Sequence, residues 1–503
     1  DSRPETESSK LPVGQSAHVC LEAKYEQIWT AFWWFDDVQI VSDSYGAFET
    51  LALQSDHARN MEFLCNLFQL LVNSIVHGHM SRAECRLDER TANLMQALES
   101  MAGDRNRPNN RLEAQTSLLI IRLNRALIDQ KRDDLPDIWR DFAAALDRAT
   151  GLCEFNADRL VSMIEHAGQV AGNDPAYNDL IERLAEFVAN RTSEAEGALI
   201  LLKRAKKLDF SDHFDMIRLL GKAAVGLTKK EHADNLIEAL QLLMLAYRSA
   251  GLLWAARASC VFVTASIIIE GEEGSHIPVS FVPTMKIWAW LALELRHLPD
   301  FLYAIQLLNG ALVSLPLAEE SQAKVREDIR ELEFALGRLF LNLSDADLRQ
   351  LENVPDILEA LGLFTARSAL LYTLGHEEKL RDDGSLPKEE RDEEVNRLFS
   401  LLASQPIAQQ TRGPMILNGE GHQSLFTTIL GMTVEISAEG NLQSILVAEA
   451  VLGSLEAFFA TAIDQRVIPH TEKLRVDLIE SAEVSQPAFA MSAMDMTATL
   501  TWP

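Results

Sequence analysis

The residue types best suited to binding a metal lie in one short stretch near residue 80. His77 and His79 offer imidazole nitrogens, Cys85 offers a thiolate, and Glu84 lies beside it. Imidazole nitrogen and thiolate sulfur are the ligands that zinc selects, but a second pair at a recognised spacing is lacking. We therefore interpret the two histidines as surface residues at the end of a helix, and we expect no metal ion.

Two other patterns resemble fragments of catalytic sites. His376-Glu377 begins like the HExxH motif of zinc proteases, but Leu380 stands where the second histidine is needed. Arg159 and His166 resemble the pair of a small helical ribonuclease, yet their interval is long and no supporting base accompanies them. The sequence also has no GxxxxGKS/T phosphate loop and no GxSxG nucleophile elbow. We therefore predict no catalytic residue and no cofactor.

The charge of the chain is strongly acidic. It has 46 lysines and arginines against 74 aspartates and glutamates, a formal net charge of −28, which repels phosphate backbones. The best basic cluster is Lys203, Arg204, Lys206 and Lys207, which we interpret as a solvated helix face near a C-terminus, where cations are favoured. We expect no nucleic-acid partner, since a nucleic-acid-binding helical repeat would need a continuous basic stripe.

Large aromatic side chains gather near the N-terminus and are followed by two acids: Trp29, Phe32, Trp33, Trp34, Phe35, Asp36 and Asp37. One interpretation is that they cover the first hydrophobic face of a helical array, as a terminal repeat must. The alternative is an anchor for a partner protein, because tryptophan is enriched at binding hot spots.

The composition is that of an ordinary folded protein, with 503 residues, 47% hydrophobic and 24% charged. The five cysteines are scattered, mostly in apolar runs, and read as buried thiols of a reducing compartment. The longest uninterrupted apolar run, near Cys260 to Ile269, falls well short of the ~20 residues of a membrane span. We expect a cytoplasmic protein without a membrane segment.

Helical periodicity dominates residues 16 to about 370. The clearest predicted helices are Met61 to Val76, Leu112 to Asp129, Ile138 to Thr150, Tyr177 to Asn190, Glu194 to Leu208, Asn235 to Ser249, Leu253 to Ile269, Met285 to Arg296, Phe301 to Val313 and Ala323 to Leu341. Ser193-x-x-Glu196 and Ser344-x-x-Asp347 mark helix starts as capping boxes. Pro136 and Pro355 mark two more starts, where a missing N–H costs nothing.

One stretch has the spacing of a known helical hairpin: Trp288-x2-Leu291-Ala292-x2-Leu295, then Ala304-x3-Leu308-x2-Ala311 and Pro316. A similar pattern lies 48 residues earlier: Leu240-x2-Leu243-Met244-x2-Tyr247, Gly251, then Ala256-x3-Cys260-x2-Val263. Ala198-x3-Leu202-x2-Ala205 repeats only the second half. The chain thus resembles tetratricopeptide-repeat (TPR) proteins, most closely over residues 285–316 and more weakly over 194–270. Ala292, Leu295 and Leu308 replace the Gly, Tyr and Phe of the usual pattern, so another helical-pair repeat is the competing interpretation.

The resemblance implies stacked hairpins, because one hairpin cannot bury its own apolar face. We expect a flexible lead-in (1–15), an irregular all-α TPR-like solenoid (16–375), a charged linker and loop (376–421) and a small, possibly incomplete α/β element (422–503). The α/β prediction follows from strand-like Met432 to Ser437, an apolar helix from Leu442 to Ile463 and strand-like segments around Arg466 and from Leu474 to Ile479.

The function that this architecture implies is a scaffold or regulatory module that binds another protein or a peptide on the concave face of its first helices. Trp288 and Trp290 lie two apart on one helix, so we expect one in the core and the other at a groove or loop contact. The alternative is the sensor or regulatory part of a larger enzyme, with its catalytic domain in or beyond the C-terminal region. The lack of a complete catalytic set argues against chemistry by this chain.

Overall fold

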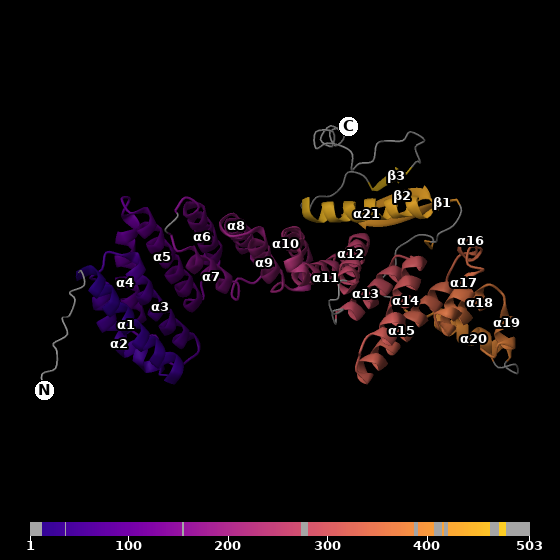
Figure 1. Ribbon diagram of the computed structural model, residues 1–503, viewed down its shortest axis with the longest axis horizontal. Coiled ribbons are helices and arrows are strands. Elements are labelled where there is room, and N and C mark those ends of the chain that lie inside the picture. The colour runs from indigo at the N-terminus through magenta and orange to yellow at the C-terminus, as the bar shows by residue number, and fades with distance from the viewer. Residues whose placement is uncertain are drawn as a thin grey trace. The chain divides into compact units, whose positions relative to one another are not determined.

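The computed structural model describes residues 13–35, 37–152, 155–272, 280–386, 391–406, 415–416, 421–462 and 472–478. The chain is mostly helical and carries one small three-stranded sheet (Figure 1). It divides into two compact units, Asp1–Asn235 and Leu236–Pro503. The sequence had not marked this boundary, which falls inside a helix. Each unit is described by itself below.

The first unit consists of helices that pack on their neighbours in the chain, such as α8 on α9 and α9 on α10. Its α-helices are α1 (Val13–Phe35), α2 (Val38–Ala52), α3 (Ala58–Val76), α4 (Leu87–Gly103), α5 (Pro108–Ile128), α6 (Leu135–Ala149), α7 (Ala157–Ala167), α8 (Pro175–Arg191), α9 (Glu194–Ala205) and α10 (His213–Gly226). Three single-turn 3-10 helices lie between them: η1 (Arg132–Asp134), η2 (Phe210–Asp212) and η3 (Lys230–His232).

The second unit continues with helices before the sheet appears. They are α11 (Ala233–Ser249), α12 (Leu253–Glu272), α13 (Phe281–Glu294), α14 (Leu298–Ser314), α15 (Glu319–Phe340), α16 (Asp345–Leu348), α17 (Val354–Ala360), α18 (Phe364–Thr373), α19 (Glu377–Asp382) and α20 (Asp392–Ala403). Here α12 packs on α13, α13 on α14, and α15 on α18. All ten helices predicted from periodicity are present, with ends that shift by a few residues.

The chemical signals at helix starts act as the sequence indicates. The Ser193 hydroxyl accepts a hydrogen bond from the backbone N–H of Glu196 (3.2 Å), and Ser344 does the same for Asp347 (3.3 Å). Pro136 and Pro355 lie in the first turns of α6 and α17. The two serine hydroxyls satisfy backbone N–H groups that have no partner within the helix, and the two prolines have no N–H group to satisfy.

The α/β element of the second unit consists of β1 (His422–Ile429), β2 (Met432–Glu439), α21 (Leu442–Ala462) and β3 (Lys473–Asp477). The strand order is β1-β2-β3, with β1 antiparallel and β3 parallel to β2. Leu430 and Gly431, both at positive φ, form the tight turn between β1 and β2. The sequence predicted β2, α21 and β3 but missed β1, while the strand-like segment around Arg466 lies outside the described residues.

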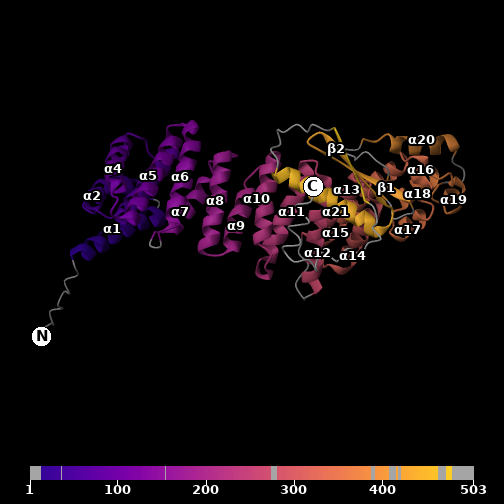
Figure 2. The same ribbon diagram turned by 90° about the horizontal axis from the view of Figure 1, so that it is seen from above.

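Helix α21 lies against α12, β1 and β2 (Figure 2). Glu449 and Glu456, its charged residues, are both buried, whereas Leu442, Leu446 and Phe458 are exposed. By length and composition alone, Leu442–Thr461 could cross a membrane, whereas the sequence predicted no membrane segment. The carboxyl groups of Glu449 and Glu456 both point into the protein, and length and composition do not indicate this orientation.

The charged segment that follows residue 375 contains packed structure of its own. Leu380 of α19 and Val395 and Phe399 of α20 are buried in a small cluster with Leu371 of α18. The sequence predicted a charged linker and loop over residues 376–421. The difference arises because each short helix turns one apolar side towards α18 while its many acids face water.

Candidate functional site

The residues of the metal-like stretch have separate partners. His77 ends α3, and its ring centre lies 6.2 Å from that of His79. The Cys85 thiol is buried against the Met80 sulfur at 3.9 Å, and burial raises the pKa of this thiol. Within the part of the chain that the structure describes, no three His, Cys, Asp or Glu side chains are grouped to hold a metal ion.

Arg159 and His166 share α7 but do not face a common point. Arg159 contacts Glu62 (Nε to Oε1, 3.1 Å) and donates to the Ser117 hydroxyl (2.9 Å), so it joins α7 to α3 and α5. The Nδ1 atom of His166 contacts the backbone oxygen of Ser162 at 2.6 Å. Arg159 therefore links helices, and the two residues form no pair.

The N-terminal aromatic residues are divided between two environments. Trp29 and Phe32 pack against the core of the first unit. Trp33, Trp34 and Phe35, at the end of α1, are mostly exposed. The first pair therefore covers the core and the last three face solvent, while their role as an anchor for a partner stays a prediction.

A groove of about 660 Å³ lies on α11, α13 and α15 of the second unit, next to the end of α20. Of these helices, α13 packs against α15. Trp290 of α13 and Phe334 of α15 give the groove large aromatic surfaces, and Phe334 is 50% exposed. Leu293 and Leu339 add buried aliphatic surface to its wall. The groove is thus mainly apolar, as sites for small molecules and peptides usually are.

The two tryptophans of α13 are divided as the sequence predicted. Trp288 is buried and donates its indole N–H to Asp300 at 2.8 Å, while its ring contacts Tyr303 edge to face. Trp290, two positions later, lines the groove. Successive residues of a helix are rotated by about 100°, so side chains two positions apart point to different sides and only one of these two lies in the core.

The rim of the groove carries more positive than negative charge. Arg248 pairs with Glu294 at 2.5 Å. Lys286 forms an ion pair with the buried carboxylate of Asp328, and Arg338 donates to the backbone oxygen of Gln405. Three cations and one carboxylate, Glu294, therefore line the groove, and Asp328 balances Lys286 from outside this lining. In a chain with a net charge of −28 this local excess is a distinctive feature.

A second charged cluster, buried at the junction of α12, α14 and α21, has a different role. Arg257 makes two hydrogen bonds to Asp300 (2.5 and 3.0 Å) and contacts Glu449 at 2.8 Å, while His297 contacts Glu449 at 2.6 Å. Burial favours a raised pKa for Asp300, but His297 and Arg257 outweigh it and hold the pKa below its usual value. All four side chains are nearly inaccessible to solvent, so the cluster joins α21 to the helices.

The basic cluster on α9 corrects one sequence interpretation. Lys203, Lys206 and Lys207 line an open pocket, but Arg204 is buried, with 3% of its surface exposed. The four cations therefore do not form one solvated face. The phase of α9 turns Arg204 towards Tyr177 of α8, over whose ring its guanidinium lies at 4.8 Å.

Comparison of the chain with protein-family models, with curated proteins and with solved structures finds no match. The functional argument therefore depends on the geometry of the sites. The sequence indicated that one of Trp288 and Trp290 would lie at a groove or loop contact, without deciding which, and it gave no sign of the contribution of α15 and α20.

Proposed function

We propose that the chain is a protein-protein interaction module in which helical hairpins stack into a TPR-like solenoid. The repeat spacing of residues 285–316 and the packing of successive helices on one another support this proposal. The observation that carries it is the apolar groove on α11, α13 and α15, which is lined by three cations and one carboxylate.

The occupant that fits this groove is a peptide segment with a large apolar side chain next to carboxylates. Trp290 and Phe334 offer rigid aromatic surface, which provides contact area at a low cost in conformational entropy. Arg248, Lys286 and Arg338 would meet the acidic groups at the rim, where charge complementarity contributes specificity and association rate.

Selection of displayed random peptides for binding to the immobilised full chain tests this proposal. We expect enriched peptides to combine aromatic or leucine side chains with Asp or Glu. Fluorescence polarisation of labelled peptides then gives their affinities. The Phe334→Ala variant should bind at least about tenfold more weakly, because truncation of an aromatic hot spot removes most of its contact.

Phe262→Ala is the matched control. Phe262 is 54% exposed, similar to Phe334, but lies on α12, a second helix of a pair. Its truncation should leave peptide affinity unchanged. A library that yields no acidic-apolar peptide, or an equal loss of affinity in both variants, would contradict the groove as the binding surface.

A further inference from the structure

We propose that a basic pocket formed by α7, α8 and α9 of the first unit binds the phosphate group of a phosphorylated small molecule. The pocket has a volume of about 400 Å³, in the range of small-molecule sites. Lys203, Arg204, Lys206 and Lys207 line it together with one carboxylate, Glu165.

The central observation is that Arg204 is a buried cation whose direct partners are neutral. Its Nε donates to the Asn178 side-chain oxygen at 2.9 Å, and its Nη2 donates to the Gly172 backbone oxygen. Among the described residues, Arg204 forms no ion pair with a carboxylate, and Asp215, Asp212 and Asp174 act on its charge only from a longer distance. A buried charge without a direct counter-ion is costly, so the pocket is primed for an anion.

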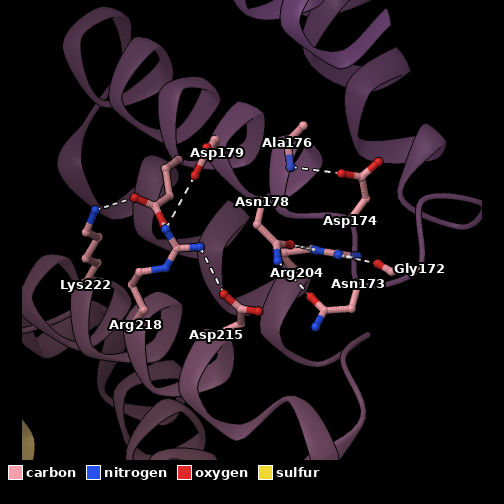
Figure 3. Close-up of polar contacts among 11 residues, drawn as sticks. Gly172, Asn173, Asp174, Ala176, Asn178, Asp179, Arg204, Asp215, Arg218 and Lys222 are labelled. Atoms are coloured by element: carbon pink, nitrogen blue, oxygen red, sulfur yellow. Dashed lines mark hydrogen bonds and ion pairs between the residues drawn. The ribbon is translucent and has the colours of Figure 1, made fainter. Parts of the chain in front are cut away.

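Arg218, on the neighbouring α10, differs from Arg204 because its partners are carboxylates (Figure 3). It contacts Asp179 at 3.5 Å, Glu182 at 2.9 Å and Asp215 at 3.1 Å. Lys222 adds an ion pair to the same Glu182. Carboxylates are thus abundant nearby, yet they gather around Arg218 and leave Arg204 with amide and carbonyl oxygens (Figure 3).

The simpler explanation of the basic cluster accounts for only part of it. Cations near the C-terminus of α9 are favoured by the helix dipole, and this is sufficient for exposed Lys206 and Lys207. The helix dipole does not explain why Arg204 is buried without a carboxylate partner. Lys203 has its own partner in Glu165 at 3.3 Å, and Lys207 contacts the Glu165 backbone oxygen.

The charge count of the pocket indicates the class of ligand. Lys203 is paired with Glu165, whereas Arg204 and Lys207 contact only neutral oxygens, and these two charges match a dianionic phosphate group better than a single carboxylate. Tyr177, Ile181 and Ile200 form the apolar part of the wall, against which the organic part of the ligand would pack. The Tyr177 hydroxyl donates to the Ile164 backbone oxygen at 2.6 Å, which fixes this wall.

Isothermal titration of the full chain with inorganic pyrophosphate, at a fixed physiological salt concentration, tests the proposal. We expect saturable binding at one site in each chain, and a panel of phosphorylated small molecules should then bind more tightly than pyrophosphate itself. The double substitution Lys203→Gln and Lys207→Gln should raise the pyrophosphate Kd by about tenfold or more, because it removes two charge-assisted contacts. Both lysines are exposed, so the variant should remain folded.

Lys222→Gln is the matched control, since Lys222 is an exposed lysine of the same unit that lies outside the pocket. It should leave the Kd unchanged. Absence of saturable pyrophosphate binding by the original chain would overturn the proposal. An equal loss of affinity in the control would also overturn it, because binding would then follow overall charge. Tighter binding of a phosphoserine peptide than of every phosphorylated small molecule would overturn the assignment to a small ligand.

Discussion

The carboxyl group of Glu456 is expected to make the second unit less stable as the pH rises. Glu456 is completely buried on α21. Its Oε2 accepts from the Ala255 backbone N–H at 2.8 Å, in the first turn of α12, and its Oε1 accepts from the Thr427 hydroxyl. Burial raises its pKa to about 7, although these hydrogen bonds act in the opposite direction.

The size of the effect follows from the difference between a pKa of about 7 in the folded chain and 4.5 for the unperturbed group. Below pH 4.5 both folded and unfolded chains hold the proton, so the contribution to stability is complete. Between pH 4.5 and 7 the unfolded chain releases its proton first, and stability falls by about 1.4 kcal/mol per pH unit. The total loss, complete above pH 7, is roughly 3 kcal/mol.

The variant Glu456→Gln should remove this dependence. Glutamine resembles the protonated acid, since its amide can donate to Thr427 while its oxygen accepts from Ala255. Urea unfolding of both chains at several pH values, with hydrogen exchange of α21 as a local readout, gives the difference in stability. The variant should match the original chain near pH 4.5 and exceed it by about 3 kcal/mol at pH 8. A difference that stays constant between pH 5 and 8 would refute the reasoning.

Two other substitutions test packing and the buried charges. A methyl group on Gly197 would overlap the backbone oxygen of Ala185, so Gly197→Ala should destabilise the first unit by about 1–3 kcal/mol. Gly221→Ala, with nothing within 4 Å, should instead stabilise it by up to about 1 kcal/mol, and thermal unfolding distinguishes the two signs. Glu449→Ala leaves Arg257 buried with only Asp300 as a carboxylate partner and should cost about 3 kcal/mol in urea unfolding. A loss below 1 kcal/mol would show that the cluster does not hold α21 in place.

The helices were predictable because their signals are local. The apolar spacing of Met61 to Val76 is sufficient to indicate α3. Ser193 marks the start of α9 because its hydrogen-bond partner, Glu196, is only three positions away in the sequence. The division of Trp288 and Trp290 was likewise predictable, since it depends only on the helical period. Such inferences need no knowledge of which helices become neighbours.

The features that the sequence missed depend on contacts between distant segments. Strand β1 follows Gly421, inside the predicted α/β element, but the sequence does not indicate it as a strand, because only its pairing with β2 identifies it. In the basic cluster, the burial of Arg204 depends on Asn178, which is 26 residues away. The groove arises because Trp290 and Phe334, on different helices, line the same hollow. Each of these requires the tertiary arrangement that periodicity alone does not contain.

The buried contacts of α21 have a consequence for the order of events during synthesis of the chain. Ala255 and Glu456 are separated by 201 residues, and His297 and Glu449 by 152. At about 5–20 residues per second, the ribosome needs roughly 10–40 s to add the longer of these intervals. During that time the start of α12 and the imidazole of His297 are made but lack their carboxylate partners. Final assembly of the second unit therefore has to wait until α21 has left the ribosome.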